Sequence, residues 1–274
     1  MISQLLEHSR PLDEIAPLGR IGLVALSTDF NSEQDLRRLY PAGVEVFTSR
    51  VANHNPMTLE NLRAMAPGIT GAAELILPGI KLDVMVYGCT AGTVAIGQER
   101  IEDLIRLARP GVPVTNPLLA GIEGCRALDA RRISLLTPYT EDVNLELAEQ
   151  FTARGFEVLS IAGLGFTDDR LVTGISPLDI VDAAVTACDP LADLLFISCT
   201  ALRASLAIAQ IEARLGKPVV SSNQAIAWHS LQLLGFSGQI SGFGRLFDQP
   251  AEEEIPANLA HLLNLPPDPG TSPK

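Results

Sequence analysis

The chain has 274 residues, of which 47% are hydrophobic and 5% aromatic, and its formal net charge at pH 7 is −12. This length suffices for one large domain or two smaller ones, and the composition favours an α/β protein over an all-β one. The negative charge argues against nucleic acid and anionic membranes as partners, because both require a basic surface.

Short apolar segments typical of β-strands alternate with amphipathic segments along the chain. The predicted strands cover residues 21–26, 44–48, 84–87, 133–136, 157–161, 194–197 and 219–220. Helical patterns lie between most of them, for example over residues 33–39, 97–108 and 204–215. Strands and helices that alternate at this spacing predict parallel βαβ units. Residues 250–274, rich in Glu and Pro, predict a loosely packed tail.

The two halves of the chain share three matched segments in the same order. The matches pair residues 20–24 with 132–136, 86–91 with 196–201, and 113–116 with 218–223. We interpret them as an internal duplication, with chance matching of apolar strands as the alternative.

Cys89 and Cys199 each follow a predicted strand, in the shared context Cys-Thr-Ala. In a parallel sheet, ligands bind at the carboxyl ends of the strands. A thiol that also begins a helix is acidified by free N–H groups and by the helix dipole. Those N–H groups, with the hydroxyls of Thr90 and Thr200, are expected to hold a carboxylate or an enolate-like oxyanion. A buried packing role is the alternative for either cysteine alone, but the shared context favours paired catalytic thiols.

The other two cysteines are expected to be packing residues. Cys125 lies in a helical pattern, Cys188 precedes Asp189-Pro190, and neither follows a strand. The chain shows no signal peptide and no membrane-spanning apolar stretch, so we expect a cytoplasmic location, no membrane partner and free thiols.

Polar residues after other strands are further candidates. Tyr139 is placed to donate a hydrogen bond to a substrate oxygen, or to fill a loop. Asp29 is placed to orient an ammonium group or a thiol, or to cap the helix that begins near Ser32. Ser222 or Asn223 is expected to cap the last helix. His229 on that helix is read as a surface or interface residue rather than a base.

Motifs for nucleotides and metals are missing from the sequence. It contains no Gly-x-Gly-x-x-Gly, no Walker loop, no His-Glu-x-x-His and no Cys-x-x-Cys. We therefore expect chemistry without a cofactor or a metal.

The two Cys-Thr motifs, Gly88-Cys89-Thr90 and Ser198-Cys199-Thr200, resemble those of the aspartate/glutamate racemase superfamily. Residues 136–139 and 218–225 resemble its maleate cis-trans isomerase and arylmalonate decarboxylase branch. A longer match that includes 25–29, 197–203 and 227–229 is most similar to the ectoine-utilisation group of that branch. The resemblance covers roughly residues 18–246.

The resemblance implies two similar α/β domains with parallel sheets, related by a pseudo-twofold axis, with the active site between them. The first domain would comprise residues 18–117 and 224–250, and the second residues 118–223, with residues 251–274 as the tail. We also expect a homo-oligomer.

The function that the resemblance implies is a cofactor-independent isomerase or racemase of a small carboxylate or amino acid. In cis-trans isomerisation, Cys89 would attack an alkene carbon and Cys199 would protonate its neighbour; in racemisation, the two thiols would exchange the α-proton on opposite faces. The alternatives are a decarboxylase, which needs only the second-half cysteine, and a carboxylate-binding protein without turnover.

The implied substrate-binding residues differ in part from the family pattern. They are Asp29, Thr90, Ala91, Tyr139, Asp169, Thr200 and Ala201. Asp29 and Asp169 stand where asparagines that bind a substrate carboxylate are expected, and Ala91 replaces the usual Ser or Gly. Because carboxylates repel a dicarboxylate and attract a cation, we expect a substrate with an amino group as well as a carboxylate.

Overall fold

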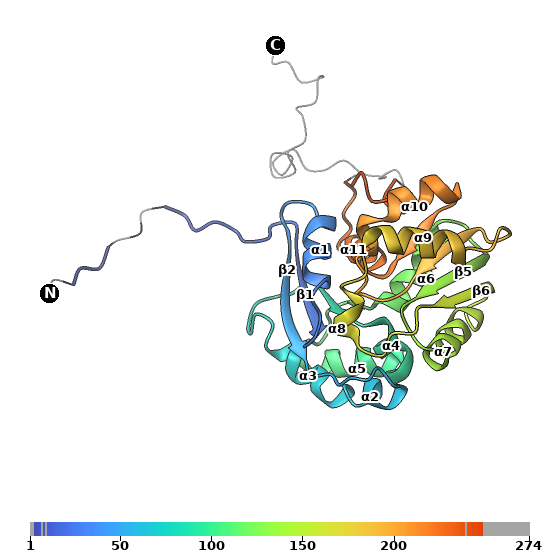
Figure 1. The fold of residues 1–274 in the computed structure, drawn as a ribbon. Coiled ribbons are helices and arrows are strands. Elements are labelled where there is room, and N and C mark those ends of the chain that lie inside the picture. Colours follow the sequence, from blue (N-terminus) through green and yellow to red (C-terminus); the bar gives the residue numbers. More distant parts are fainter. Residues whose placement is uncertain (1–2, 7, 9, 239, 249–274) are drawn as a thin grey trace, which may run out of the picture.

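A computed structural model describes residues 3–6, 8, 10–238 and 240–248 of the chain (Figure 1). The strands are β1 (Gly19–Leu26), β2 (Val44–Val51), β3 (Val84–Tyr87), β4 (Val114–Thr115), β5 (Arg132–Thr137), β6 (Glu157–Gly163), β7 (Leu194–Ile197) and β8 (Val219–Ser221). The predicted tail at 251–274 lies outside the described residues.

The helices of the described residues lie between and after the strands. In the first half they are α1 (Ser32–Leu39), α2 (Leu59–Arg63), α3 (Ala66–Glu74), α4 (Thr90–Ile96) and α5 (Gln98–Ala108). The second half has α6 (Pro117–Ala127), α7 (Glu141–Thr152), α8 (Asp169–Val172), α9 (Pro177–Ala187), the 3₁₀ turn Ala204–Leu206, α10 (Ile208–Leu215) and α11 (Ser222–Leu234).

The strands form two four-stranded sheets with the same internal order. The first sheet runs β2-β1-β3-β4 and the second β6-β5-β7-β8, and the strand pairs in both are parallel. Every residue of β3 and β7 is buried, as expected for central strands covered by helices on both faces. The two-unit α/β architecture predicted from the sequence is thus confirmed.

The same contacts recur at the amino ends of both sheets. The Arg20 backbone N–H donates to the Asp83 carboxylate at 2.9 Å, and the Arg132 backbone N–H donates to the Asp193 carboxylate at 2.9 Å. In return, the N–H groups of Asp83 and Asp193 donate to the carbonyls of Arg20 and Arg132. The repeated contacts support the duplication inferred from the sequence.

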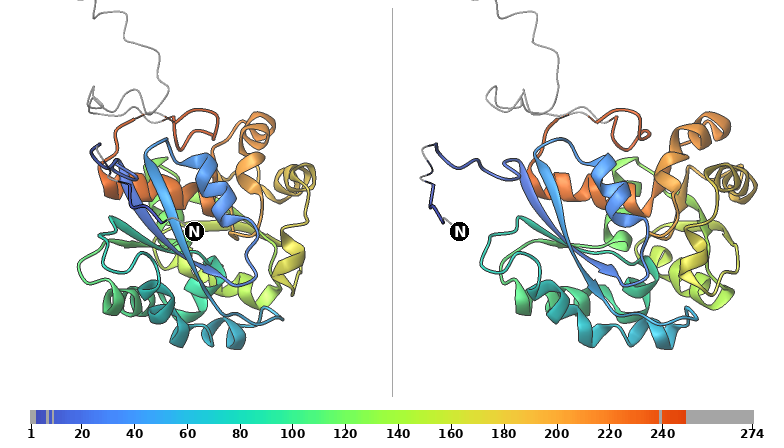
Figure 2. Two further views of the ribbon diagram at one scale, coloured as in Figure 1. Left: turned by 90° about the vertical axis from the view of Figure 1, so that its left-hand side faces the viewer. Right: turned by 60° about the vertical axis from the view of Figure 1, so that its left-hand side comes forward.

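Helix α11 joins the two halves of the molecule. It follows β8 of the second sheet, yet it packs against α1 of the first half and against α6. Figure 2 shows this orange helix beside the blue first half. Its capping residue is Ser221, not Ser222 or Asn223 as predicted: the Ser221 side chain accepts from the Gln224 N–H in a capping box. Ser222 and Asn223 are thereby free for other contacts.

The predicted elements differ from the observed ones mainly at their ends. Strand β2 runs on to Val51, three residues beyond the predicted end, and the two-residue strand β4 was not predicted. The helix predicted over 204–215 is broken, because a 3₁₀ turn ends at Leu206 and α10 begins only at Ile208. No described helix has the length and apolar character to span a bilayer.

Candidate active site

One cavity between the two halves contains both sequence-matched cysteines. All nine predicted site residues line it: Asp29, Cys89, Thr90, Ala91, Tyr139, Asp169, Cys199, Thr200 and Ala201. The loops after β1, β3, β5, β6 and β7 supply these residues. They are brought together because ligand-binding loops of parallel sheets gather at the carboxyl ends of the strands.

The cavity also contains residues that the sequence analysis missed. Asn53 and His54 follow β2, and α2 with its flanking residues contributes an apolar wall that includes Met57, Leu62 and Met65. The signal for Asn53 was its place directly after a strand, but the strand was expected to end at residue 48. None of the described residues that line this cavity is a lysine or an arginine.

Cys89 is the N-cap of α4, as the sequence predicted. Its Sγ accepts a hydrogen bond from the Gly92 N–H at 3.2 Å. Burial nevertheless raises the pKa of the Cys89 thiol, and the nearby Cys199, Asp169 and Asp29 raise it further, since each adds negative charge. Cys89 is therefore a neutral thiol at physiological pH.

Cys199 is held differently, and the predicted helix start is wrong here. Its φ of +99° is rare for a residue with a side chain, and a turn rather than a helix follows it. Hydrogen bonding from the N–H groups of Ala201 and Leu202 and from the side chain of Tyr139 lowers the pKa of its thiol, and the Leu202 N–H donates to the Cys199 carbonyl at 3.3 Å. Burial outweighs these hydrogen bonds and raises the pKa of Cys199 to about 12. A strained backbone with converging donors is typical of a functional residue.

Tyr139 lies inside the site rather than filling a remote loop. It is buried, and its hydroxyl accepts a hydrogen bond from Ser198 Oγ at 3.3 Å and interacts with Cys199. Burial raises the pKa of Tyr139 well above its usual value, so the phenol stays protonated as a donor. Because the Tyr139 hydroxyl already interacts with Cys199, the predicted hydrogen bond to a substrate oxygen would be a second role for this residue.

The hydroxyls of Thr90 and Thr200, which line the cavity, bond to protein groups of the other half. Thr200 Oγ1 donates to the Gly88 carbonyl at 3.0 Å, and Thr90 Oγ1 lies 2.9 Å from Ser222 Oγ. Ser222 in turn accepts from the Cys199 N–H at 3.0 Å. These hydroxyls tie the two Cys-Thr segments together, because each satisfies a buried polar group of the other half.

Asp29 caps the start of α1, one of the two roles that the sequence left open, and it also lines the cavity. Its carboxylate accepts from the N–H groups of Asn31 at 2.7 Å and Ser32 at 2.9 Å and from the Ser32 hydroxyl, so it caps the start of α1. Burial raises the pKa of Asp29, partly offset by these donors and by Arg50.

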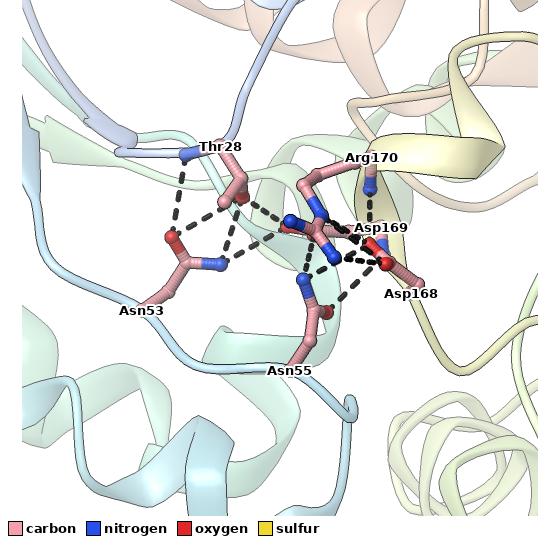
Figure 3. A network of polar contacts seen from close by, with 6 residues as sticks. All are labelled: Thr28, Asn53, Asn55, Asp168, Asp169 and Arg170. Atoms are coloured by element: carbon pink, nitrogen blue, oxygen red, sulfur yellow. Dashed lines mark hydrogen bonds and ion pairs between the residues drawn. The ribbon is translucent and has the colours of Figure 1, made fainter.

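Asp169 lies at the centre of a polar network between the halves (Figure 3). Its carboxylate accepts from the Thr28 hydroxyl, from Asn53 Nδ2 at 3.0 Å and from Asn55 Nδ2 at 2.9 Å. These donors are all uncharged and come from the first half, whereas Asp169 belongs to the second. The neighbouring Asp168 also accepts from Asn55 Nδ2, at 3.0 Å, and pairs with Arg170.

The remaining sequence candidates lie outside the cavity. Cys125 is fully buried in α6 and Cys188 follows α9, which fits the predicted packing roles, and all four cysteines are free thiols. His229 is half-buried, its Nδ1 is 2.8 Å from Thr115 Oγ1, and its ring stacks on Trp228. Among the described residues no His, Cys, Asp and Glu cluster could hold a metal ion.

A family model described as arylmalonate decarboxylase matches residues 96–247, more than half of the chain. The chain belongs to the arylmalonate decarboxylase family. A maleate isomerase from Nocardia farcinica is 30% identical over 242 residues, which cover 84% of this chain and 96% of the isomerase. An arylmalonate decarboxylase from Bordetella bronchiseptica is 36% identical over 142 residues, or 51% of this chain and only 59% of that enzyme.

Solved structures of this family share the fold. A liganded double mutant of arylmalonate decarboxylase is 30% identical and has a TM-score of 0.76, with 84% of this chain and 99% of that one covered. A mutant of the Nocardia farcinica isomerase with a covalently bound succinylcysteine intermediate is 25% identical, with a TM-score of 0.75 and coverage of 86% and 99%. The relatives thus include isomerases and a decarboxylase that share one architecture.

Proposed function

We propose that this family member is an isomerase or racemase of a small carboxylate that also bears an amino group, with Cys89 and Cys199 as its reactive groups. The observation that carries the proposal is that both thiols line one cavity, each supplied by a different half. Two thiols on opposite sides of a substrate suit reactions in which one group takes a proton or attacks a carbon while the other donates a proton.

The hydrogen-bond donors around the two sulfurs favour an order of events. Cys199 has three donors and Cys89 has one, so negative charge is better accommodated on Cys199. In racemisation from this state, the Cys199 thiolate takes the α-proton and the Cys89 thiol donates its proton to the opposite face. The reverse direction starts from the Cys89 thiolate. The resemblance assigns Cys89 as the nucleophile for cis-trans isomerisation and gives no order for racemisation.

The charges around the cavity favour an ammonium group on the substrate. Asp29 and Asp169 both line it, and no lysine or arginine does in the part of the chain that the structure describes. A dicarboxylate would add charge of the same sign, whereas an ammonium group would offset it and lower the pKa of both thiols. A place in ectoine breakdown, cytoplasmic location and a homo-oligomeric state are parts of this proposal that rest on the sequence.

A test is exchange with solvent deuterium. The protein is incubated in D₂O with single enantiomers of amino acids, including diamino acids, and with maleate. Deuterium at the α-carbon together with loss of optical purity identifies a racemase; conversion of maleate without α-exchange identifies a cis-trans isomerase. Slow alkylation of both thiols that no carboxylate ligand prevents would instead indicate a protein without turnover.

Decarboxylation is the second candidate, because the family match begins at residue 96 and so contains Cys199 but not Cys89. A decarboxylase would release CO₂ from an arylmalonate and would keep this activity in Cys89→Ser. Loss of all turnover in that variant would exclude a mechanism with Cys199 alone.

A further inference from the structure

A buried carboxylate on α1, outside the cavity, contacts the loop that carries Cys199. Asp35 is fully buried, and its Oδ2 accepts from Asn31 Nδ2 at 3.0 Å and from Asn223 Nδ2 at 2.9 Å. Its charged neighbour is Arg38, whose half-exposed guanidinium is 3.5 Å away. Burial raises the pKa of Asp35. Keeping a carboxylate in such a place costs stability, which calls for an explanation.

Both carboxamides that bind Asp35 also bind the loop after Cys199. The Thr200 carbonyl accepts from Asn31 Nδ2 at 3.0 Å and from Asn223 Nδ2 at 2.9 Å. Asn31 donates as well to the Leu202 carbonyl at 3.0 Å. One carboxylate thus directs two amide groups onto the same peptide.

The geometry of a peptide connects these contacts to the thiol. In a planar trans peptide the C=O and N–H bonds point in opposite directions. The Thr200 carbonyl and the Ala201 N–H belong to one peptide, so fixing the carbonyl toward the asparagines fixes the N–H on the other side. Hydrogen bonding from that N–H is one of the effects that lower the pKa of the Cys199 thiol.

The orientation of Asn223 is held by two acceptors, the Asp35 carboxylate and the Thr200 carbonyl. Both groups only accept hydrogen bonds, so the NH₂ of Asn223 must face them. As a result Asn223 Oδ1 is buried without a hydrogen-bond partner among the described residues. The charged carboxylate is the stronger acceptor, so its loss would leave the Thr200 carbonyl to hold the amide with a weaker partner beside it and would loosen this arrangement.

We propose that Asp35 is a positioning residue that, through Asn31 and Asn223, aims the Ala201 N–H at the sulfur of Cys199. The relevance of this role to turnover rests on the proposed function, but the arrangement itself can be tested without a substrate. Asp35 does not line the cavity, so its effect reaches Cys199 through the loop after that cysteine, of which the Thr200–Ala201 peptide is a part. The titratable groups that act on Cys199 include Tyr139 and Asp29, and they remain in place.

The experiment follows iodoacetamide alkylation of each cysteine in the full chain by peptide mass spectrometry from pH 7 to 10. Asp35→Asn is expected to slow the alkylation of Cys199 about tenfold at each pH, because one hydrogen bond to the thiolate is weakened. The alkylation rate of Cys89 should not change. Glu212→Gln is the matched control. Glu212 is another buried carboxylate, which accepts from the N–H groups of Val219 and Arg245. The Glu212→Gln substitution should destabilise the fold without slowing the alkylation of Cys199.

The proposal is overturned if Cys199 is alkylated as fast in the folded Asp35→Asn variant as in the parent protein. It is also overturned if Glu212→Gln slows the alkylation of Cys199 by the same factor as Asp35→Asn. Should Asp35→Asn fail to fold, Asn31→Ser provides the second variant. This substitution removes the hydrogen bonds to the carbonyls of Thr200 and Leu202, while Asn223 still binds Asp35. It should slow the alkylation of Cys199 by a smaller factor than Asp35→Asn does. No change in folded Asn31→Ser would also refute the proposal. A protein without any detectable turnover would refute the proposed function and leave these alkylation results valid.

Discussion

The Nδ2 atom of Asn223 lies 2.9 Å from the Oδ2 atom of Asp35, although 188 positions separate the two residues in the sequence. Asn223 is in the first turn of α11, where the chain returns from the second sheet, and Asp35 is on α1 of the first half. The contact therefore joins the two halves directly behind the Cys199 loop.

Asn223→Asp should strongly destabilise the fold, because it places a second carboxylate against buried Asp35. We expect the free energy of unfolding to fall by about 3 kcal/mol or more, as for other unpaired buried charges. Urea denaturation measures the loss. Gln232→Glu, which adds a charge on the exposed face of the same helix, should change stability by less than about 0.5 kcal/mol. Equal stability of the two variants would contradict the buried contact.

Cys89→Ser and Cys199→Ser should each lower kcat by about 10²- to 10⁴-fold on the substrate identified by deuterium exchange, since both proton transfers are required. Cys125→Ser is the control, because Cys125 is equally buried but lies in α6 outside the cavity. Full activity in either cavity variant would rule out a two-thiol reaction.

Asp169→Asn should change which substrates bind. Removing this carboxylate is expected to raise KM for an ammonium-bearing substrate by about 10-fold or more and to improve binding of a dicarboxylate, because one like charge is lost. Asp168→Asn is the neighbouring control: that carboxylate pairs with Arg170 and does not line the cavity. If the two variants shift KM alike, Asp169 does not recognise the substrate charge.

The sequence predicted which residues meet at the site better than it predicted what they do there. The polar and thiol residues that follow strands were correctly predicted to lie together, because the carboxyl ends of parallel strands meet at one edge of each sheet. The hydroxyls of Thr90 and Thr200 were assigned to a substrate, yet they bind Ser222 and Gly88 of the other half. Pairings between distant segments depend on how the halves pack, and no local pattern reports this.

The backbone conformation around Cys199 was also not predicted from the sequence. The Cys-Thr-Ala repeat suggested two equivalent helix starts, and only Cys89 begins a helix. The positive φ of Cys199 and the turn after it depend on long-range bonds, including that from its N–H to Ser222. The asymmetry between two otherwise matched thiols became visible only with those contacts.

Ser222→Ala should destabilise the protein by about 1–3 kcal/mol, because the buried N–H of Cys199 loses its acceptor and Thr90 loses its hydroxyl partner. Thr173→Val is the comparison, since the buried Thr173 hydroxyl has no partner among the described residues and its removal should cost less. Thermal and urea unfolding would rank the two. A smaller loss in Ser222→Ala than in Thr173→Val would argue against the bridge between the Cys-Thr segments.

The two cavity thiols should ionise in a fixed order as pH rises. Burial raises the pKa of both, to about 12 for Cys199 and higher for Cys89, so the reactive thiolate fraction of each is small at pH 7 and grows about tenfold per pH unit. Cys199 should therefore be alkylated faster than Cys89 at every pH between 7 and 10. A bound ammonium-bearing carboxylate too small to block the sulfurs should increase the thiolate fraction, and a dicarboxylate should decrease it, which thiolate absorbance near 240 nm would record. If Cys89 is alkylated faster than Cys199 throughout this pH range, the assigned order of ionisation is wrong. If the thiolate absorbance is equal with both ligands, the electrostatic argument for an amino group on the substrate is lost.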